Sequence, residues 1–436
     1  MLVTMTLHSS VMAPETRRAQ LDTLAEVTAI PTAAGHEDRV IAYIEAWVRA
    51  RTDLRLQTDR AGNLVVSFAK QKATKRPPLF ITAHLDHPAF VVERLLPEGR
   101  FECSFRGGVM EVFFDHAPIT VHTAEGIVPA TLSGPASAHS PAGKHYLAES
   151  ERVNATVSVG DVGTWMLPGP ELETSTGYFH TPACDDLAAA AAALGAMDGL
   201  RAARARREKT EDVRLLFTRS EEIGFIGAIA AVKLKTIPKN ARVLALENSR
   251  SFADSPLGGG PIVRVGDRLS IFTPWLTAAC AQRAEEVFGG SSSPTASQTR
   301  AQTTRRPWQR KLMSGGACEA SVFCHAGFAA TCICLPLGNY HNMPHLDQLQ
   351  AGTYDATETG PPRAAPEFIH VEDYYGLIDL LVGLGLRLPD QASDFGDRLD
   401  KLYNERAYVL DRPGAKEPRK TAARRRKPAA KPRAKR

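Results

Sequence analysis

A histidine and an aspartate follow a short apolar segment near the start of the sequence. His84 and Asp86 come directly after Leu79 to Ala83, a segment typical of a buried strand. Alternating residues of a strand point to the same side, so the two side chains should share a face. A carboxylate beside a metal-bound histidine can accept its second ring N–H and fix the orientation of the ring. The alternative is a pair of exposed turn residues, and the pair alone does not decide between the two.

Two pairs of acids lie at similar strand ends. Asp185 and Asp186 precede an alanine-rich helical segment, where one carboxylate is usually a helix cap. Asp185 lies one position further out, and its two oxygens could face two metal ions. Glu221 and Glu222 lie between an apolar strand and a helix of small residues, where two carboxylates repel each other unless a cation lies between them.

Glu247 and His341 complete the set, each after another strand-like segment. Neither is specific alone, but ligands of open α/β sheets bind at the carboxyl ends of the strands, where all five places should meet. Oxygen and imidazole ligands without a thiolate fit a catalytic rather than a structural zinc site. The set offers one histidine, a shared acid and a further acid for each of two ions, and leaves one glutamate as a general base.

The elements around these residues predict an α/β fold. Apolar residues at helical spacing alternate with short apolar segments, which is typical of a mainly parallel sheet covered by helices on both faces. We expect strands at 79–83, 213–218, 242–247 and 331–336, and helices at 37–51, 186–197, 224–235, 277–288 and 371–386.

The segment from about Ala89 to Gly177 differs from the rest. Short β-like pieces alternate there with Gly and Pro, and no segment has helical periodicity, which predicts a small inserted β-domain. The pieces are 101–105, 109–114, 119–122, 127–132 and 153–159. We therefore divide the chain into a catalytic domain in two parts (14–88 and 178–410), the inserted β-domain (89–177) and a disordered basic tail (411–436).

Composition narrows the function classes. The chain of 436 residues is 43% hydrophobic and 23% charged, as in globular proteins, and no segment has the length of a membrane span. Its seven cysteines are odd in number, scattered along the chain and without a CxxC pair, which argues against a disulfide framework and against a cysteine zinc site. The net charge of +5 comes from the tail, where twelve Lys or Arg face one acid, so the body carries about −6 and a basic nucleic-acid-binding domain is not indicated. We expect a cytoplasmic location.

The site residues, in this order and with a β-domain between them, resemble the co-catalytic zinc aminopeptidases and deacylases of phosphorylase/hydrolase-like fold. The resemblance is greatest to the tetrahedral, glutamyl and deblocking aminopeptidases, some of which were misnamed endoglucanases. It covers about Pro14 to Leu388. Val159 to Thr164 is similar to the stretch that leaves the family's insertion, and Gly315 to Ala320 to its Gly-Gly-Thr-Asp-Ala segment.

This resemblance implies a metal-dependent aminopeptidase with two divalent ions per subunit; zinc is expected, with cobalt and manganese as alternatives. One ion would be held by His84, Asp185 and Glu247, and the other by Asp185, Glu222 and His341. Asp86 would orient His84. Glu221 would be the base that takes a proton from the attacking water and later gives it to the leaving amine.

The resemblance also implies peptide substrates and a homo-oligomer formed through the inserted β-domain, with no membrane partner. The chain departs from the family pattern at three places: Leu187 replaces Arg, Glu247 replaces Asp, and His87-Pro88 replaces Glu-Ile. Two other functions stay open. One is an N-acyl deacylase or carboxypeptidase on the same scaffold. The other is a catalytically inactive protein that binds anionic polymers through the basic tail. If the protein is an active enzyme, we expect the tail to bind nucleic acid only weakly.

Overall fold

The fold is taken from a computed structural model that describes residues 13–71, 76–141, 143–150, 156–293, 299, 304–389 and 393–410. The chain divides into two units, one ending at Gln391 and one beginning at Ala392. The second unit contains helix α10 (Ser393–Arg406) and a 3-10 turn, η4 (Ala407–Leu410).

An eight-stranded sheet forms the centre of the first unit, and its four middle strands β12, β3, β13 and β16 are parallel. The apolar middle strands are buried on both faces, as a sheet covered by helices requires. Antiparallel pairings occur between β1 and β2, β2 and β12, and β16 and β14. In spatial order the strands are β1 (Leu54–Thr58), β2 (Leu64–Phe68), β12 (Val213–Thr218), β3 (Leu79–His84), β13 (Arg242–Arg250), β16 (Ala329–Leu337), β14 (Ile262–Asp267) and β15 (Gln309–Met313).

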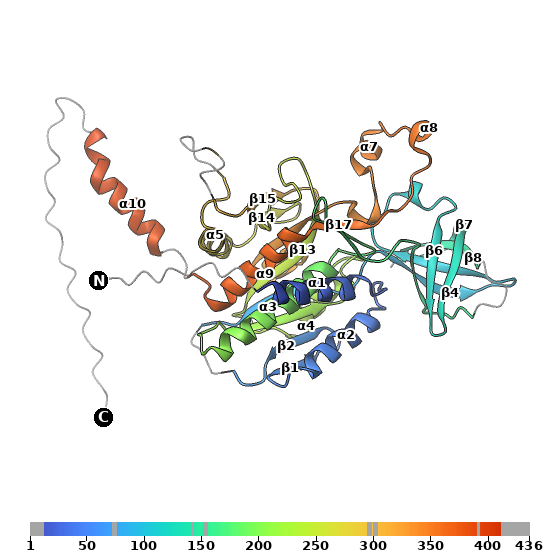
Figure 1. The fold of residues 1–436 in the computed structure, drawn as a ribbon, viewed down its shortest axis with the longest axis horizontal. Helices are drawn as coiled ribbons and strands as arrows, with labels where there is room; N and C mark the ends of the chain where they lie inside the picture. Colours follow the sequence, from blue (N-terminus) through green and yellow to red (C-terminus); the bar gives the residue numbers. More distant parts are fainter. Residues whose placement is uncertain are drawn as a thin grey trace. The chain divides into compact units, whose positions relative to one another are not determined.

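Helices cover both faces of this sheet (Figure 1). The larger core lies between one face and the helices α1 (Pro14–Thr28), α2 (Asp38–Arg49), α3 (Leu187–Ala205), α5 (Pro274–Phe288) and α9 (Val371–Leu386). The other face packs against α4 (Ile226–Lys233) and α6 (Glu319–His325). Helix α3 begins with a run of fully buried alanines, and these small side chains let its N-terminal end lie close under the sheet.

A closed six-stranded barrel is inserted after β3, drawn in cyan and teal in Figure 1. Its interior is filled by aromatic rings, among which Phe114 and Tyr146 stack with centroids 4.3 Å apart. All its strands lie within the range expected for the inserted β-domain, whose boundaries stay a prediction. They are β4 (Ala89–Leu95), β5 (Arg100–Arg106), β6 (Pro118–Thr123), β7 (Gly126–Ser140), β8 (Gly143–Ser150) and β9 (Val162–Trp165).

A small three-stranded sheet brings Glu367 to the site. Its strands are β10 (Glu171–Glu173), β11 (Tyr178–Thr181) and β17 (Glu367–His370). Between β16 and β17 the chain forms a 3-10 turn, η3 (Tyr340–Asn342), and two short helices, α7 (Leu346–Ala351) and α8 (Ala356–Thr359). These connections matter for the site because η3 carries His341.

The expected fold class is confirmed, and the predicted strands and helices of the α/β part occur. Most ends are shifted by a few residues, but the helix expected at 186–197 continues to Ala205. The prediction of a β piece at 109–114 is wrong, because Glu111–Phe113 form a 3-10 turn, η1, that closes the barrel with Phe113 and Phe114. Of the piece expected at 153–159, residues 156–159 form no strand and the rest lie outside the described residues, as does the basic tail 411–436. Among the described residues, no helix is long and apolar enough to span a membrane.

Candidate metal centre

The carboxyl ends of the parallel strands bring the predicted site residues together. His84 is the last residue of β3, Glu247 lies on β13, and Glu221 and Glu222 follow β12. Asp185 precedes helix α3, and its peptide bond to Asp186 is cis. His341, on η3, follows β16. All seven predicted side chains, including Asp86, therefore lie in one buried cluster, and what each of them does stays a prediction.

Asp185 lies between the two histidines. Its Oδ1 is 3.4 Å from His84 Nε2, and its Oδ2 is 3.6 Å from His341 Nε2. The two oxygens of one carboxylate thus face two different imidazoles, as a carboxylate shared by two metal ions would. Asp185 Oδ1 is also buried without a hydrogen-bond partner.

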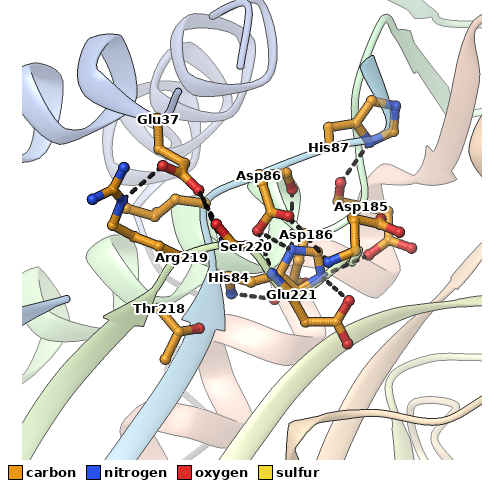
Figure 2. Close-up of polar contacts among 12 residues, drawn as sticks. Glu37, His84, Asp86, His87, Asp185, Asp186, Thr218, Arg219, Ser220 and Glu221 are labelled. Carbon is orange, nitrogen blue, oxygen red and sulfur yellow. Dashed lines mark hydrogen bonds and ion pairs between the residues drawn. The ribbon is translucent and has the colours of Figure 1, made fainter. Parts of the chain in front are cut away.

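Three glutamates surround this arrangement. Glu222 Oε1 lies 3.3 Å from His341 Nε2, on the same side as Asp185 Oδ2. Glu247 has a carboxylate oxygen within 4.8 Å of ligand atoms of His84 and Asp185. Glu221 Oε2 lies 4.0 Å from His84 Nε2 (Figure 2). The carboxylates of Glu221 and Glu247 thus flank one imidazole, and that of Glu222 flanks the other.

The second ring nitrogen of each histidine is held by a backbone carbonyl. His84 Nδ1 lies 3.0 Å from the carbonyl oxygen of Asp86, and His341 Nδ1 lies 2.7 Å from that of Gly108 in the barrel. A hydrogen donated from each Nδ1 leaves Nε2 with its lone pair facing the carboxylates, which is the tautomer that binds a metal ion. The barrel therefore contributes directly to the orientation of His341.

Asp86 has a task that the sequence did not reveal. Its side chain lies 3.6 Å from His84 Nδ1, but its two oxygens accept hydrogen bonds from the backbone N–H groups of Glu221 (2.9 Å) and Glu222 (3.0 Å). Figure 2 shows the Asp86 side chain next to His84 and Glu221. Asp86 thus positions the two glutamates as well as the histidine.

Glu367 is a buried carboxylate that sequence analysis missed. It accepts hydrogen bonds from three backbone N–H groups, those of Cys184 (2.6 Å), Asp185 (3.0 Å) and His341 (2.8 Å). His341 has a left-handed φ of 54°, which is uncommon for a residue other than glycine, and the bond to its N–H helps to hold it there. The only signal in the sequence was an acid at the start of a short alternating segment.

Two further side chains fix the loops around the centre. Glu37 accepts hydrogen bonds from the backbone N–H of Ser220 (3.0 Å) and from Arg219 Nε (2.7 Å), which anchors the turn after β12 (Figure 2). His87, one of the departures from the family pattern, binds the carbonyl oxygen of Asp185 through Nδ1 at 2.6 Å. Its Nε2 lies 3.1 Å from Asn342 Oδ1, which links the Asp185 segment to η3.

The electrostatics show that the cluster attracts positive charge. Burial lowers the pKa of His84 and His341, but the neighbouring carboxylates outweigh it. Glu221 and Asp185 raise the pKa of His84 well above its usual value, and Glu222 and Asp185 do the same for His341. Burial, with further carboxylates nearby, raises the pKa of Glu221 and Glu247. Cations placed among these carboxylates would supply the missing charge and displace the histidine protons.

The described residues therefore fit a metal centre. Three overlapping groups of residues each have ligand atoms that lie within 4.8 Å of one another. The groups are His84, Glu221 and Glu247; His84, Asp185 and Glu222; and Asp185, Asp186 and Glu247. The donor set is imidazole and carboxylate only, which suits a catalytic zinc ion. An orphaned oxygen on Asp185 points into the same group.

A cavity of about 530 Å³ opens beside Glu247, and its walls carry two unpaired polar side chains. The amide nitrogen and oxygen of Asn248 are buried without partners. Arg264, on β14, is 1% exposed. Among the described residues its side chain donates to Ser249 Oγ alone (3.0 Å), and its Nε and one terminal nitrogen have no partner there. Burial opposes its charge, but nearby cysteines and Glu247 favour it and raise its pKa; no described carboxylate lies within ion-pair distance of it. A buried guanidinium without such a partner is costly unless a ligand completes it. The sequence signal for Arg264 was one cation within an apolar strand.

Comparisons with known proteins agree with this geometry. The family model for M42 glutamyl aminopeptidase matches residues 62–287, more than half of the chain. The chain belongs to the M42 glutamyl aminopeptidase family. It is therefore a hydrolase, a metal-dependent aminopeptidase, and the family expected from the sequence is confirmed. A search among curated proteins found no match.

Solved structures share the fold of this family member. The TET1 peptidase of Pyrococcus horikoshii is 19% identical, with a TM-score of 0.62 over 85% of this chain and 100% of that one. A TET aminopeptidase from a marine sediment archaeon, Thaumarchaeota archaeon SCGC AB-539-E09, is 19% identical, with a TM-score of 0.63 over 86% and 97%. A Thermotoga maritima protein described as an endoglucanase is 17% identical, with a TM-score of 0.53 over 83% and 96%.

Replacing Glu367 with glutamine should loosen the centre. An amide accepts hydrogen bonds at one oxygen only, so at least one of the three backbone N–H groups would face an N–H₂ group. We expect the free energy of unfolding to fall by about 1–3 kcal/mol and the metal affinity to fall roughly 10- to 100-fold. Denaturant titration and chelator competition measure the two effects.

The exposed Glu125, between β6 and β7, supplies the control: Glu125→Gln should leave both quantities unchanged. A Glu367→Gln protein that binds metal as tightly as the parent would show that Glu367 does not support the centre.

Proposed function

We propose that this protein removes acidic residues from the free amino end of peptides at a centre of two divalent metal ions. The observation that carries the proposal is the position of Asp185, whose two oxygens face His84 and His341 separately. His84, Asp185 and Glu247 would hold one ion, and Asp185, Glu222 and His341 the other. Zinc is expected, with cobalt and manganese as alternatives. When bound, two such ions activate water and polarise the scissile carbonyl.

Glu221 is the proposed general base. Its carboxylate is buried beside His84, and its backbone is fixed by Asp86, so it can meet a reacting water in a constant orientation. Burial and the neighbouring carboxylates raise its pKa, which favours a group that accepts a proton from water and then returns it to the leaving amine. Asp86 and Glu367 act through the backbone: they position Glu221, Glu222, Asp185 and His341 and touch no substrate.

The cavity beside Glu247 supports a preference for an acidic first residue. Arg264 offers two nitrogens without a described partner at its wall, and a Glu or Asp side chain is the anion that would satisfy them in an aminopeptidase. Asn248 could bind polar groups of the substrate backbone through its unpaired amide. The description of the matching family as glutamyl aminopeptidase agrees with this preference.

Self-association is part of the proposal. The TET1 peptidase of Pyrococcus horikoshii can assemble into a tetrahedron or a large octahedral shell. We propose that this chain also forms a homo-oligomer, with the inserted β-domain at 89–177 as the contact. A deacylase or carboxypeptidase would use the same ions, but the family match favours an aminopeptidase.

The role of Glu221 predicts a loss of activity without a loss of metal. Glu221→Gln should keep both ions, because the amide keeps the size of the side chain, but turnover should fall by about 10²- to 10⁴-fold. Asp185→Ala should lose metal, because it removes the carboxylate proposed to be shared. Elemental analysis and peptide hydrolysis distinguish the two. If Glu221→Gln stays active, Glu221 is not the base.

The role of Arg264 predicts a change of specificity. Arg264→Met should lower kcat/KM for a Glu-initiated peptide by roughly 10²-fold, because the substrate carboxylate would lose its charged partner. A Leu-initiated peptide should be cleaved at least as well as before. Arg310→Met, at an exposed position of β15, is the matched control and should change neither value. An unchanged ratio of the two substrates in Arg264→Met would contradict the assignment.

A further inference from the structure

Helix α10, labelled in Figure 1, has an exposed apolar side. Leu399, Leu402 and Tyr403 are three or four positions apart, so they lie on the same side of the helix. The turn η4 follows directly and adds three more apolar side chains. The six side chains are between 41% and 71% exposed: Leu399, Leu402, Tyr403, Tyr408, Val409 and Leu410. Apolar side chains that gather on one exposed element are typical of a surface that binds a partner.

The sequence after this apolar side is strongly basic. Within α10 itself, three basic and four acidic residues nearly cancel. In residues 412–436, twelve Lys or Arg face one acid, Glu417, which gives a net charge of +11. An exposed apolar side and a large positive charge are therefore neighbours in the chain, and the partner of this region should account for both.

The peptidase part of the chain does not explain these features. The family resemblance ends near Leu388, before α10, and α10 belongs to the second unit of the chain. The TET1 peptidase structure is matched over its whole length by 85% of this chain, so part of this chain has no counterpart there. The expectation that the protein has no membrane partner came from the same resemblance and does not extend to α10.

An anionic lipid surface accounts for both features. An amphipathic helix can lie in the membrane interface with its apolar side among the acyl chains, and tyrosine side chains favour that interface. A neighbouring polybasic segment is attracted to anionic headgroups. A nucleic acid would bind the basic residues but would leave the apolar side in water. A second copy of the chain could cover the apolar side, but it would bring a second segment of the same charge, which repels the first.

We propose that α10 and η4, together with the basic residues after them, bind this enzyme to the surface of an anionic lipid bilayer. The apolar side chains enter the headgroup region, and the Lys and Arg side chains meet the lipid phosphates. A single weak anchor gives only marginal membrane binding, so stable binding requires both parts. The proposal concerns the second unit alone and does not depend on the substrate or the metal ions of the peptidase site.

Vesicle flotation of the full-length, metal-loaded protein tests the proposal, and a large oligomer that sediments by itself does not disturb this measurement. The protein should float with vesicles of phosphatidylcholine and phosphatidylglycerol but not with vesicles of phosphatidylcholine alone. Raising the ionic strength from about 0.1 to 1 M should weaken the binding at least about ten-fold, because the screening length falls from roughly 10 to 3 Å.

Two variants separate the two parts of the surface. Replacing both leucines (Leu399→Ser with Leu402→Ser) should lower the partition coefficient roughly 10- to 100-fold, because less apolar surface leaves water. Deleting residues 411–436 should lower it by about 10²-fold or more, because the headgroups lose their cationic partners. Asn404→Ser, on the polar side of α10, is the matched control and should bind like the parent. All the replaced side chains are exposed, so the melting temperature of the serine variants should equal that of the parent.

Equal binding to vesicles with and without phosphatidylglycerol, or unchanged binding after replacement of the two leucines, would overturn the proposal. A smaller oligomer of the leucine variant in lipid-free analytical ultracentrifugation would assign the apolar side to a second copy of the chain. Binding of duplex DNA by the parent without binding of anionic vesicles would assign the basic residues to nucleic acid. Each of these last two results would also overturn the proposal.

Discussion

The site depends on the burial of several carboxylates around two imidazoles. Asp185, Glu221, Glu222 and Glu247 lie within a few ångströms of His84 or His341 and are shielded from water. Negative charges in a poorly polarisable interior repel strongly, so the cluster requires positive charge. The carboxylates raise the pKa of His84 and His341, so without a metal ion the two rings would supply this charge by binding protons. The two divalent cations that we propose would meet the same requirement, and they would let these carboxylates and imidazoles act as a hydrolytic centre.

The rest of the fold supplies this cluster with backbone contacts. Glu367 binds the N–H groups of Asp185 and His341, and Asp86 binds those of Glu221 and Glu222. Each carboxylate joins loops that are distant in sequence, so the ligands keep their spacing even though most lie outside regular strands. The inserted segment adds the Gly108 carbonyl to His341, and Gly108 and Val109 line the cavity beside Glu247. An insertion that looks peripheral in the sequence therefore takes part in the centre.

Much of this was readable in the sequence, and the rest was not for identifiable reasons. His84, Glu221 and Glu247 could be found because each lies at or near the carboxyl end of an apolar strand, and parallel strands end at one edge of the sheet. Glu367 and Arg264 could not, because their importance lies in contacts between segments far apart in the chain. The second task of Asp86 was hidden for the same reason. The 109–114 segment was misjudged because its apolar residues fill the end of the barrel instead of pairing in a strand.

The central claim is that the centre is a metal site acting on a free amino end. Mass spectrometry of matched Glu-initiated peptides, one with a free and one with an acetylated amino end, tests it most directly, in enzyme loaded with zinc or cobalt and after chelation. The account predicts loss of the first residue from the free peptide only, abolished by chelation and restored by metal. Cleavage of the acetylated peptide alone, or cleavage that survives complete removal of metal, would contradict it.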